Sequence, residues 1–276
     1  MQSLESTIEN PAIMQEDQSR TTGSYPKPAT ECGIEWTEIT WNPIRGCRLV
    51  SPGCINCYAM RMALRLAGKG KPYEGLVRTT KNGPRWTGKV RMEETMLNKP
   101  YGWKKPRIVF VNSMSDLFYE GFNMEDVQRV FEVMRDTPQH IYQILTKRSE
   151  RLRDLAPEID WPDNVWMGVS VENNDYLYRL DHLKETHAKI KWVSVEPLIG
   201  HLDDFDPTGL DWVVVGGESR PGSRLMQKEW VTDIRGKCLE TGVPFFFKQW
   251  GGVRKKQTGR LIDGRTWDQM PVVVEM

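Results

Sequence analysis

The sequence contains no apolar run near the roughly 20 residues that a helix needs to cross a bilayer, which excludes an ordinary helical membrane protein. Its first residues lack the charged-then-apolar pattern of a secretory signal. Internal repeats and low-complexity tracts are also absent. These absences leave a globular protein, which we expect to find in the cytoplasm with no membrane partner.

Cysteine and histidine are scarce, with five and four copies in 276 residues. No histidine is spaced to share a metal ion with the cysteines, yet three cysteines stand close together at Cys47, Cys54 and Cys57. Because cytosolic thiols are kept reduced, such a cluster indicates a metal site or catalysis before it indicates disulfides.

The formal net charge is only +1, but the charges are unevenly distributed. Residues 1–40 carry an acidic excess, whereas the interval 61–91 holds nine cations and one acid, Glu74. The stretch KNGPRWTGKVR combines these cations with a tryptophan, and phosphates and bases attract such surfaces. We predict that DNA or RNA is bound there through Arg85, Trp86, Lys89 and Arg91. The alternatives are a protein or peptide partner and a merely solubilising surface.

Short β-rich runs recur along the chain and alternate with amphipathic segments. The predicted strands are 36–41, 107–112, 142–146, 165–171, 192–196, 212–216 and 245–249. Helices are predicted at 124–135 with Asn123 as N-cap, after Ser149 as N-cap, and at 227–241 with Gly242 at the C-terminus. Strands that are apolar almost throughout, alternating with helices, predict an α/β fold with a full or partial barrel of parallel strands. An open doubly wound sheet is the alternative.

Six of these strands end in polar residues. The pairs are Asn112 and Ser113, Thr146 and Lys147, Ser170 and Glu172, Ser194 and Glu196, Gly217 and Glu218, and Lys248 and Gln249. Active sites of β/α barrels form at the carboxyl ends of the strands. We therefore expect the functional site at this end of the sheet.

The three cysteines have the spacing C-x6-C-x2-C on a turn that glycine and proline allow to fold sharply. Thiolates select zinc, copper or iron–sulfur clusters. With Cys32 as a fourth ligand, the turn would hold structural zinc. Without it, three thiolates on a four-iron cluster leave one iron open to a substrate or cofactor. Cys238 falls on a helix stripe and is expected in the core.

The stretch NPIRGC…GCINCYA resembles the cluster loop of radical S-adenosylmethionine (SAM) enzymes, in the branch that includes relatives of the spore photoproduct lyases. The later stretches VFVNSMSDLF, QILTKR, GVSVEN, VSVEPL, VVVGGESRPGSR, KQWGG and GRLIDGRTWDQMP resemble a phage-associated family of unassigned function, often classed as radical-SAM-like. The resemblance covers residues 33–271 and implies a radical-SAM-like partial β/α barrel, a [4Fe–4S] cluster and SAM.

The resemblance implies that Cys47, Cys54 and Cys57 each bind one iron and that the amino and carboxylate groups of SAM chelate the fourth. Ser113, Ser115 and Asp116 stand where the family has a Gly-Gly-Glu-like element for the SAM amino group, and they are the predicted substitutes. Tyr58 is predicted to pack beside adenine, or to anchor the helix that follows the turn.

Further cofactor contacts are predicted at the other strand ends. Lys147, next to Arg148, is expected to meet a carboxylate of SAM or a substrate phosphate. Glu172 and Glu196 end matched V-S-V-E tetrads and are predicted to bind SAM ribose or substrate. We add Ser170 to this set.

A Gly-Gly-Glu occurs at the sixth predicted strand. Gly217 would let the backbone approach a ligand there. Glu218 would bind a ribose hydroxyl or a cation.

The resulting hypothesis is an enzyme that cleaves SAM reductively to a 5′-deoxyadenosyl radical, uses an external electron donor and acts on a nucleic-acid-related substrate. The alternatives are a nucleic-acid-binding protein with structural zinc or an iron–sulfur site and no SAM cleavage, and a barrel that keeps the cluster only as a sensor or scaffold. The expected organisation is a flexible arm (1–32), a barrel (33–252) with a basic insertion (58–106), and a C-terminal extension (253–276).

Overall fold

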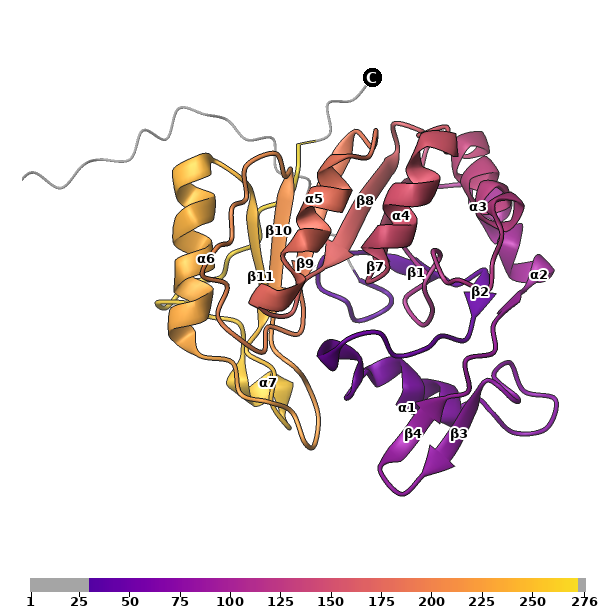
Figure 1. Cartoon of the computed structure of the whole chain (residues 1–276), viewed down its shortest axis with the longest axis horizontal. Helices are drawn as coiled ribbons and strands as arrows, with labels where there is room; N and C mark the ends of the chain where they lie inside the picture. The colour runs from indigo at the N-terminus through magenta and orange to yellow at the C-terminus, as the bar shows by residue number, and fades with distance from the viewer. Residues whose placement is uncertain (1–29, 273–276) are drawn as a thin grey trace, which may run out of the picture.

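The computed structural model describes residues 30–272, in which seven parallel strands form one sheet (Figure 1). The strands, in both chain and spatial order, are β1 (Ile39–Trp41), β6 (Ile108–Val111), β7 (Ile141–Thr146), β8 (Val165–Ser170), β9 (Ile190–Val195), β10 (Trp212–Gly216) and β11 (Phe245–Gln249). All seven predicted strands are confirmed. Sequential parallel strands joined by crossovers are the arrangement expected of an α/β barrel.

Ring contacts of Trp36, just before β1, show that the sheet is strongly curled. Its ring centroid lies 5.3 Å from that of Trp192 in β9 and 6.0 Å from that of Trp212 in β10. In a flat sheet, β1 and β9 would be roughly 19 Å apart, because neighbouring strands lie about 4.8 Å apart. Within residues 30–272, β1 and β11 are edge strands that do not pair with each other. The predicted barrel is therefore confirmed in its partial form.

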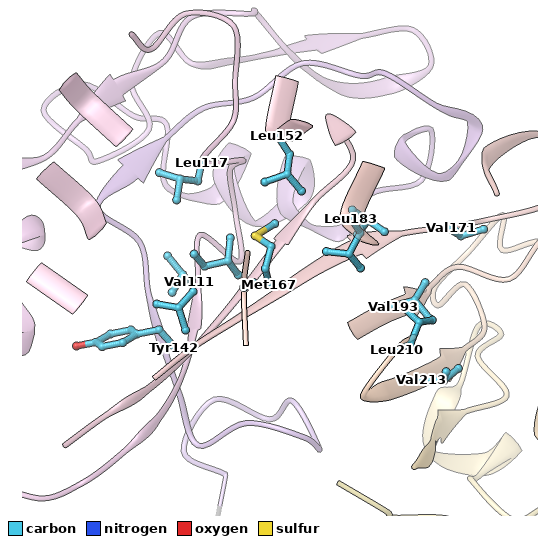
Figure 2. Close-up of a cluster of buried hydrophobic side chains, with 14 of the residues drawn as sticks. Val111, Leu117, Tyr142, Leu152, Met167, Val171, Leu183, Val193, Leu210 and Val213 are labelled. Carbon is cyan, nitrogen blue, oxygen red and sulfur yellow. The ribbon is translucent and has the colours of Figure 1, made fainter. Parts of the chain in front are cut away.

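Side chains along each strand point alternately to the two faces of the sheet, so the core has two layers. The outer layer lies between the sheet and helices α3 (Met124–Asp136), α4 (Ser149–Leu155), α5 (Tyr178–Lys184) and α6 (Lys228–Thr241). Figure 2 shows part of it, with Met167 and Val193 of the strands near Leu152 and Leu183 of the helices. The inner layer is mostly aromatic and fills the interior of the barrel. It includes Trp36, Phe110, Trp166, Trp192, Trp212 and Phe246.

A glycine makes room for this inner layer. Gly168 in β8 lies opposite Trp192 in β9. A Cβ at position 168 would approach the Trp192 ring to 2.4 Å, much closer than van der Waals contact. Glycine at this strand position is therefore required by packing inside the barrel.

The helix boundaries follow the sequence signals with one exception. Asn123 caps α3 and forms a capping box with Asp126, as its sequence predicts. Gly242 ends α6 in the left-handed conformation, with φ of 70°. The prediction that Ser149 caps α4 is wrong, because Ser149 is the first helical residue. Its hydroxyl instead pairs with Nδ1 of His182 on α5, over 2.9 Å.

The predicted insertion forms a lobe of its own, built on α1 (Tyr58–Arg65), β3 (Val77–Thr80) and β4 (Gly83–Trp86). In Figure 1 it lies below the sheet. A short ladder of β2 (Ile44–Arg45) with β5 (Arg91–Met92), followed by α2 (Glu94–Leu97), connects it to the barrel. The lobe has its own apolar cluster, and Cys47 and Cys57 pack against that cluster. The insertion lobe therefore supports the cysteine turn directly.

The region after β11 packs onto the barrel. Its one helix within the described range is α7 (Lys255–Thr258). Beyond it, Asp268 forms an antiparallel bridge with Phe246, and Ile262 and Trp267 join the outer core layer. The predicted C-terminal extension is thus integrated into the fold as far as residue 272. The predicted N-terminal arm lies almost entirely outside the described residues.

Across residues 30–272, no helix combines the length and the apolar character that crossing a membrane requires.

Candidate functional site

A cavity of about 270 Å³ opens at the carboxyl ends of the strands. Trp36 and Phe110 of the inner core layer contribute apolar lining. The polar strand ends line it as well, and only Glu172 of the predicted pairs is outside the lining. The lining strand-end residues are Asn112, Ser113, Thr146, Lys147, Ser170, Ser194, Glu196, Gly217, Glu218, Lys248 and Gln249. The expectation of a site at this end of the sheet is supported by a shared cavity.

All three clustered cysteines line the same cavity. Their turn is fixed at its start by Gly46, whose φ is 93° and whose Cβ, if present, would lie 2.2 Å from the carbonyl oxygen of Lys89. A single 3-10 turn, Pro52–Cys54, then reverses the chain. Cys57 is the N-cap of α1. The glycine and proline of the turn and the start of α1 thus place the sulfurs of all three cysteines at the same cavity.

The three thiols have different polar surroundings. The guanidinium of Arg148 donates from Nη1 to Sγ of Cys47 over 3.9 Å, and the Ser51 hydroxyl lies 3.7 Å from Sγ of Cys54. Burial raises the pKa of the Cys47 thiol to about 12, against the lowering effect of Arg148. Burial and the neighbouring Cys54 also raise the pKa of Cys57, although amides at the start of α1 lower it. Without a bound cation, the raised pKa values of Cys47 and Cys57 favour the protonated form of these two thiols.

The arrangement of the thiols bears on the kind of group they can hold. Among the described residues, no three histidine, cysteine, aspartate or glutamate side chains converge closely enough to bind a single metal ion. A polynuclear iron–sulfur group does not require its cysteines to converge on one ion, because each thiolate binds a different iron. Cys32 is outside the cavity lining, and Cys238 is fully buried in the outer core, as expected.

Asp116 and Arg148 form a buried ion pair on the wall beside Cys47. Their closest atoms are 2.8 Å apart, and their side chains are 7% and 4% exposed. Asp116 also accepts from the Thr146 hydroxyl and from two backbone amides. Four donors fill the acceptor capacity of a carboxylate. Asp116 therefore anchors Arg148, and since it also lines the cavity, its contact with the SAM amino group stays a prediction.

Glu172 is completely buried behind the cysteine turn. It accepts from Arg179 over 3.0 Å and from the Ser51 hydroxyl over 2.5 Å, and Lys147 lies 3.3 Å away. A Cβ at Gly53 would approach its carboxylate to 2.6 Å. The predicted ribose contact is corrected, because Glu172 instead fastens the turn to the barrel.

Glu218 performs a similar function on the opposite side of the turn. It pairs with Arg224 over 2.5 Å and accepts from the Asn56 amide over 2.9 Å. Burial acts to raise the pKa of Glu218, but the hydrogen bonds from Arg224 and Asn56 outweigh it and hold the pKa below its usual range. Arg224 also donates to the carbonyl of Pro52. Sequence reasoning missed Arg224 and Asn56, because neither stands at a strand end.

Gly217 packs against backbone as well as lining the cavity. A Cβ there would meet the carbonyl oxygen of Trp250 at 2.1 Å. At Gly251, whose φ is 82°, a Cβ would lie 2.3 Å from the carbonyl oxygen of Glu218. The two glycine pairs in the motifs GGE and WGG therefore let the ends of β10 and β11 pack together.

Glu196 faces the cavity from β9 and pairs with Lys248, with closest atoms 3.2 Å apart. Gly216 leaves space for it, because a Cβ at that position would lie 2.3 Å from Oε1 of Glu196. Lys147 and Ser170 also line the cavity. These three predicted cofactor contacts, Glu196, Lys147 and Ser170, remain available at the cavity wall, and their role stays a prediction.

Tyr58 and the two serines after β6 are engaged in contacts within the protein. The Tyr58 hydroxyl donates to the carbonyl of Ser113 over 2.5 Å, which ties α1 to the end of β6. The hydroxyl of Ser113 bonds to Asn42, and that of Ser115 bonds to the carbonyl of Ile44. All three residues still line the cavity. The predicted anchoring role of Tyr58 is therefore observed, and an adenine contact stays a prediction.

Polar atoms in the cavity wall are left without a partner. Nδ2 of Asn112 and Oε1 of Gln249 are buried and form no hydrogen bond with other described residues, and the same holds for the indole nitrogen of Trp36. All three residues line the cavity. Buried polar groups normally have partners, so these three unpaired atoms stand out among the residues that line the cavity.

The predicted nucleic-acid contacts divide into buried and exposed residues. Trp86 is only 8% exposed and packs near Tyr73 in the lobe, so the prediction that it stacks on a base is wrong. Arg91 is paired with Glu93 over 2.5 Å. Arg85 is half-buried and Lys89 is exposed. Of the four predicted contacts, Lys89 is exposed and Trp86 is buried, and nucleic-acid binding by this surface stays a prediction.

Comparison with known proteins gave one family and two solved structures. The family model described as "Protein of unknown function (DUF5131)" matches residues 31–271. Two structures of spore photoproduct lyase are similar, a Cys-to-Ser mutant and a double mutant with bound S-adenosylmethionine and dinucleoside spore photoproduct. Each is 12% identical with a TM-score of 0.40, and the matches cover 79% and 80% of this chain but only 65% of the other. No curated protein gave a significant match.

Proposed function

We propose that this chain, which belongs to the family described as "Protein of unknown function (DUF5131)", is a radical SAM-type enzyme with a [4Fe–4S] cluster on Cys47, Cys54 and Cys57. One observation carries the proposal. Three thiols, with no fourth cysteine in the lining, share a cavity with the polar residues at the carboxyl ends of the parallel strands. A cluster held by three residues has one iron free for a cofactor.

When bound, the cluster and SAM would supply reductive cleavage of SAM to a 5′-deoxyadenosyl radical, with the electron coming from an external donor. The chain's own residues hold the turn and line the cavity. Glu172 and Glu218 fasten the turn from two sides, so that the three sulfurs keep their places. The aromatic layer closes the barrel below, which excludes water from that direction.

Other groups of the cavity wall suit a polar, charged cofactor. The paired Lys248 and Glu196 offer one cation and one carboxylate to amino, carboxylate or hydroxyl groups. The free amide atoms of Asn112 and Gln249 add one donor and one acceptor. These four side chains are the proposed contacts to SAM, together with the predicted Lys147 and Ser170.

This function is tested by anaerobic reconstitution with iron and sulfide, followed by reduction in the presence of SAM. We expect methionine and 5′-deoxyadenosine in equal amounts. The unreconstituted protein is the control and should form neither product. A brown, iron-loaded protein that binds SAM but forms no deoxyadenosine would favour the sensor or scaffold alternative.

We further propose a nucleic-acid-related substrate, bound through phosphates at the insertion lobe. Between residues 58 and 90, the lobe exposes six cations that form no ion pair with any described residue. They are Arg65, Lys69, Lys71, Arg78, Lys81 and Lys89. Unpaired surface cations displace counterions from a phosphate backbone, which gives salt-dependent, sequence-independent affinity. The core of the same lobe packs against Cys47 and Cys57, which supports a substrate bound by the lobe and delivered to the cavity.

Replacing Lys69, Lys71 and Arg78 by glutamine is expected to weaken binding of a DNA or RNA oligonucleotide. The dependence of log K on log salt concentration should become shallower by about two to three units, as expected for three lost phosphate contacts. Fluorescence anisotropy at several salt concentrations measures both effects.

The matched control replaces three cations on the helical side that are already paired with acids, namely Arg135, Lys189 and Lys228. It removes the same charge and should leave the salt dependence nearly unchanged. Equal weakening by both triple variants would show that net charge, and not the lobe surface, governs binding.

A further inference from the structure

Arg148 is the most tightly held cation beside the cysteine turn. Its Nη1 lies 2.8 Å from Asp116, its Nε lies 3.1 Å from Glu120, and its Nη2 donates to the carbonyl of Arg48 over 3.1 Å. The guanidinium stacks on the ring of Tyr119, 4.7 Å from the centroid. Every part of the planar group is thereby fixed in position.

One donor of this fixed group is directed at a thiol of the proposed cluster site. Nη1 donates to Sγ of Cys47 over 3.9 Å, and the Arg148 side chain is only 4% exposed. Arg148 follows β7, whereas Cys47 belongs to the turn after β2, so the contact joins segments about 100 positions apart. From sequence, Arg148 is expected beside Lys147 as a partner of SAM or phosphate, and in the fold its nitrogens already contact Asp116, Glu120 and the carbonyl of Arg48.

We propose that Arg148, acting through Cys47, sets the reduction potential of the cluster. The inference rests on the proposed function, because it requires an iron–sulfur group on Cys47. Hydrogen bonds and charges near the sulfurs are among the factors that set such potentials. Reduction adds one negative charge to the cluster, so a buried cation nearby stabilises the reduced form and raises the potential.

Asp116 has the opposite effect on the same equilibrium. Its carboxylate lies next to Arg148 and partly cancels the guanidinium charge. The other charged groups facing this pair are Glu120, which is half-exposed, and Lys147, whose amide bonds to Asp116. Removing the cation and removing the anion should therefore shift the potential in opposite directions, although both substitutions break the same ion pair.

The experiment is a redox titration of the reconstituted protein, followed by electron paramagnetic resonance, on the unmodified chain, Arg148→Gln and Asp116→Asn. Arg148→Gln is expected to reduce the ratio of reduced to oxidised cluster by about tenfold at a fixed applied potential, which is about 59 mV for one electron. Asp116→Asn is expected to increase that ratio. Arg148→Lys keeps the charge and should retain most of the original potential.

A merely structural role would give shifts of the same sign in Arg148→Gln and Asp116→Asn, or no shift in either, and both results would overturn the inference. Should Arg148→Gln fail to fold, the comparison of Asp116→Asn with Arg148→Lys still decides, because an unshifted Asp116→Asn contradicts the proposal. Failure of the unmodified protein to bind any cluster would overturn the proposed function and this inference together. A cluster with unshifted potentials would overturn the inference alone.

Discussion

Replacing Cys47, Cys54 and Cys57 together by alanine is expected to lower the bound iron from about four per chain to near zero. Iron should be lost because these three thiols line one cavity and no fourth cysteine is there to replace them. The barrel should remain folded, because its two core layers do not depend on these sulfurs. Iron analysis and circular dichroism after anaerobic reconstitution measure the two quantities.

The matched control is Cys32→Ala, which removes a thiol that precedes β1 and lies outside the cavity lining. Iron content should be unchanged in this variant. If Cys32→Ala instead lost metal and stability together, a four-cysteine zinc site would replace the proposed cluster. Unchanged iron in the triple variant would show that the cysteine turn is not the binding site.

Glu172→Ala is expected to destabilise the fold by about 3–5 kcal/mol, since it leaves a buried arginine without its carboxylate. Arg179 is 1% exposed and Glu172 is fully buried, so water cannot replace the lost partner. The loss should also loosen the turn, because the Ser51 hydroxyl bonds to the same carboxylate. Urea unfolding, monitored by tryptophan fluorescence, measures the free energy of unfolding.

The control for this prediction removes both charges, in the double variant Glu172→Met with Arg179→Met. Replacing both partners of a buried pair by apolar groups of similar size costs much less than breaking it. The double variant should therefore be more stable than Glu172→Ala. A Glu172→Ala protein with normal stability but weakened SAM affinity would restore the ribose-binding role predicted from sequence.

The strands and the location of the site could be predicted from sequence because both depend on local patterns. Parallel strands buried on both faces give continuous apolar runs, such as WVVVG at β10, and several of the seven strands were predicted in this way. Their polar ends follow directly in sequence, as with Thr146 and Lys147. The three cysteines stand within eleven residues, so their shared cavity follows from one short turn.

The roles of single charged residues could not be predicted, because they depend on partners that the fold brings together. Glu172 was predicted only from its place at a strand end, yet it forms a fully buried pair with Arg179. Glu218 pairs with Arg224, which lies on the loop that follows β10. Trp86 reads as an aromatic among surface cations, but the packing of the lobe buries it. Only the tertiary structure shows whether such a residue holds the protein together or is free to bind a ligand.

The measurement that tests the central claim most directly is the electron paramagnetic resonance spectrum of the reconstituted, reduced protein, recorded with and without SAM. The account predicts about four irons per chain and a spectrum that changes when SAM is added, because one iron has no protein ligand. Stoichiometric zinc with no iron, or an iron signal that SAM leaves unchanged, would contradict it.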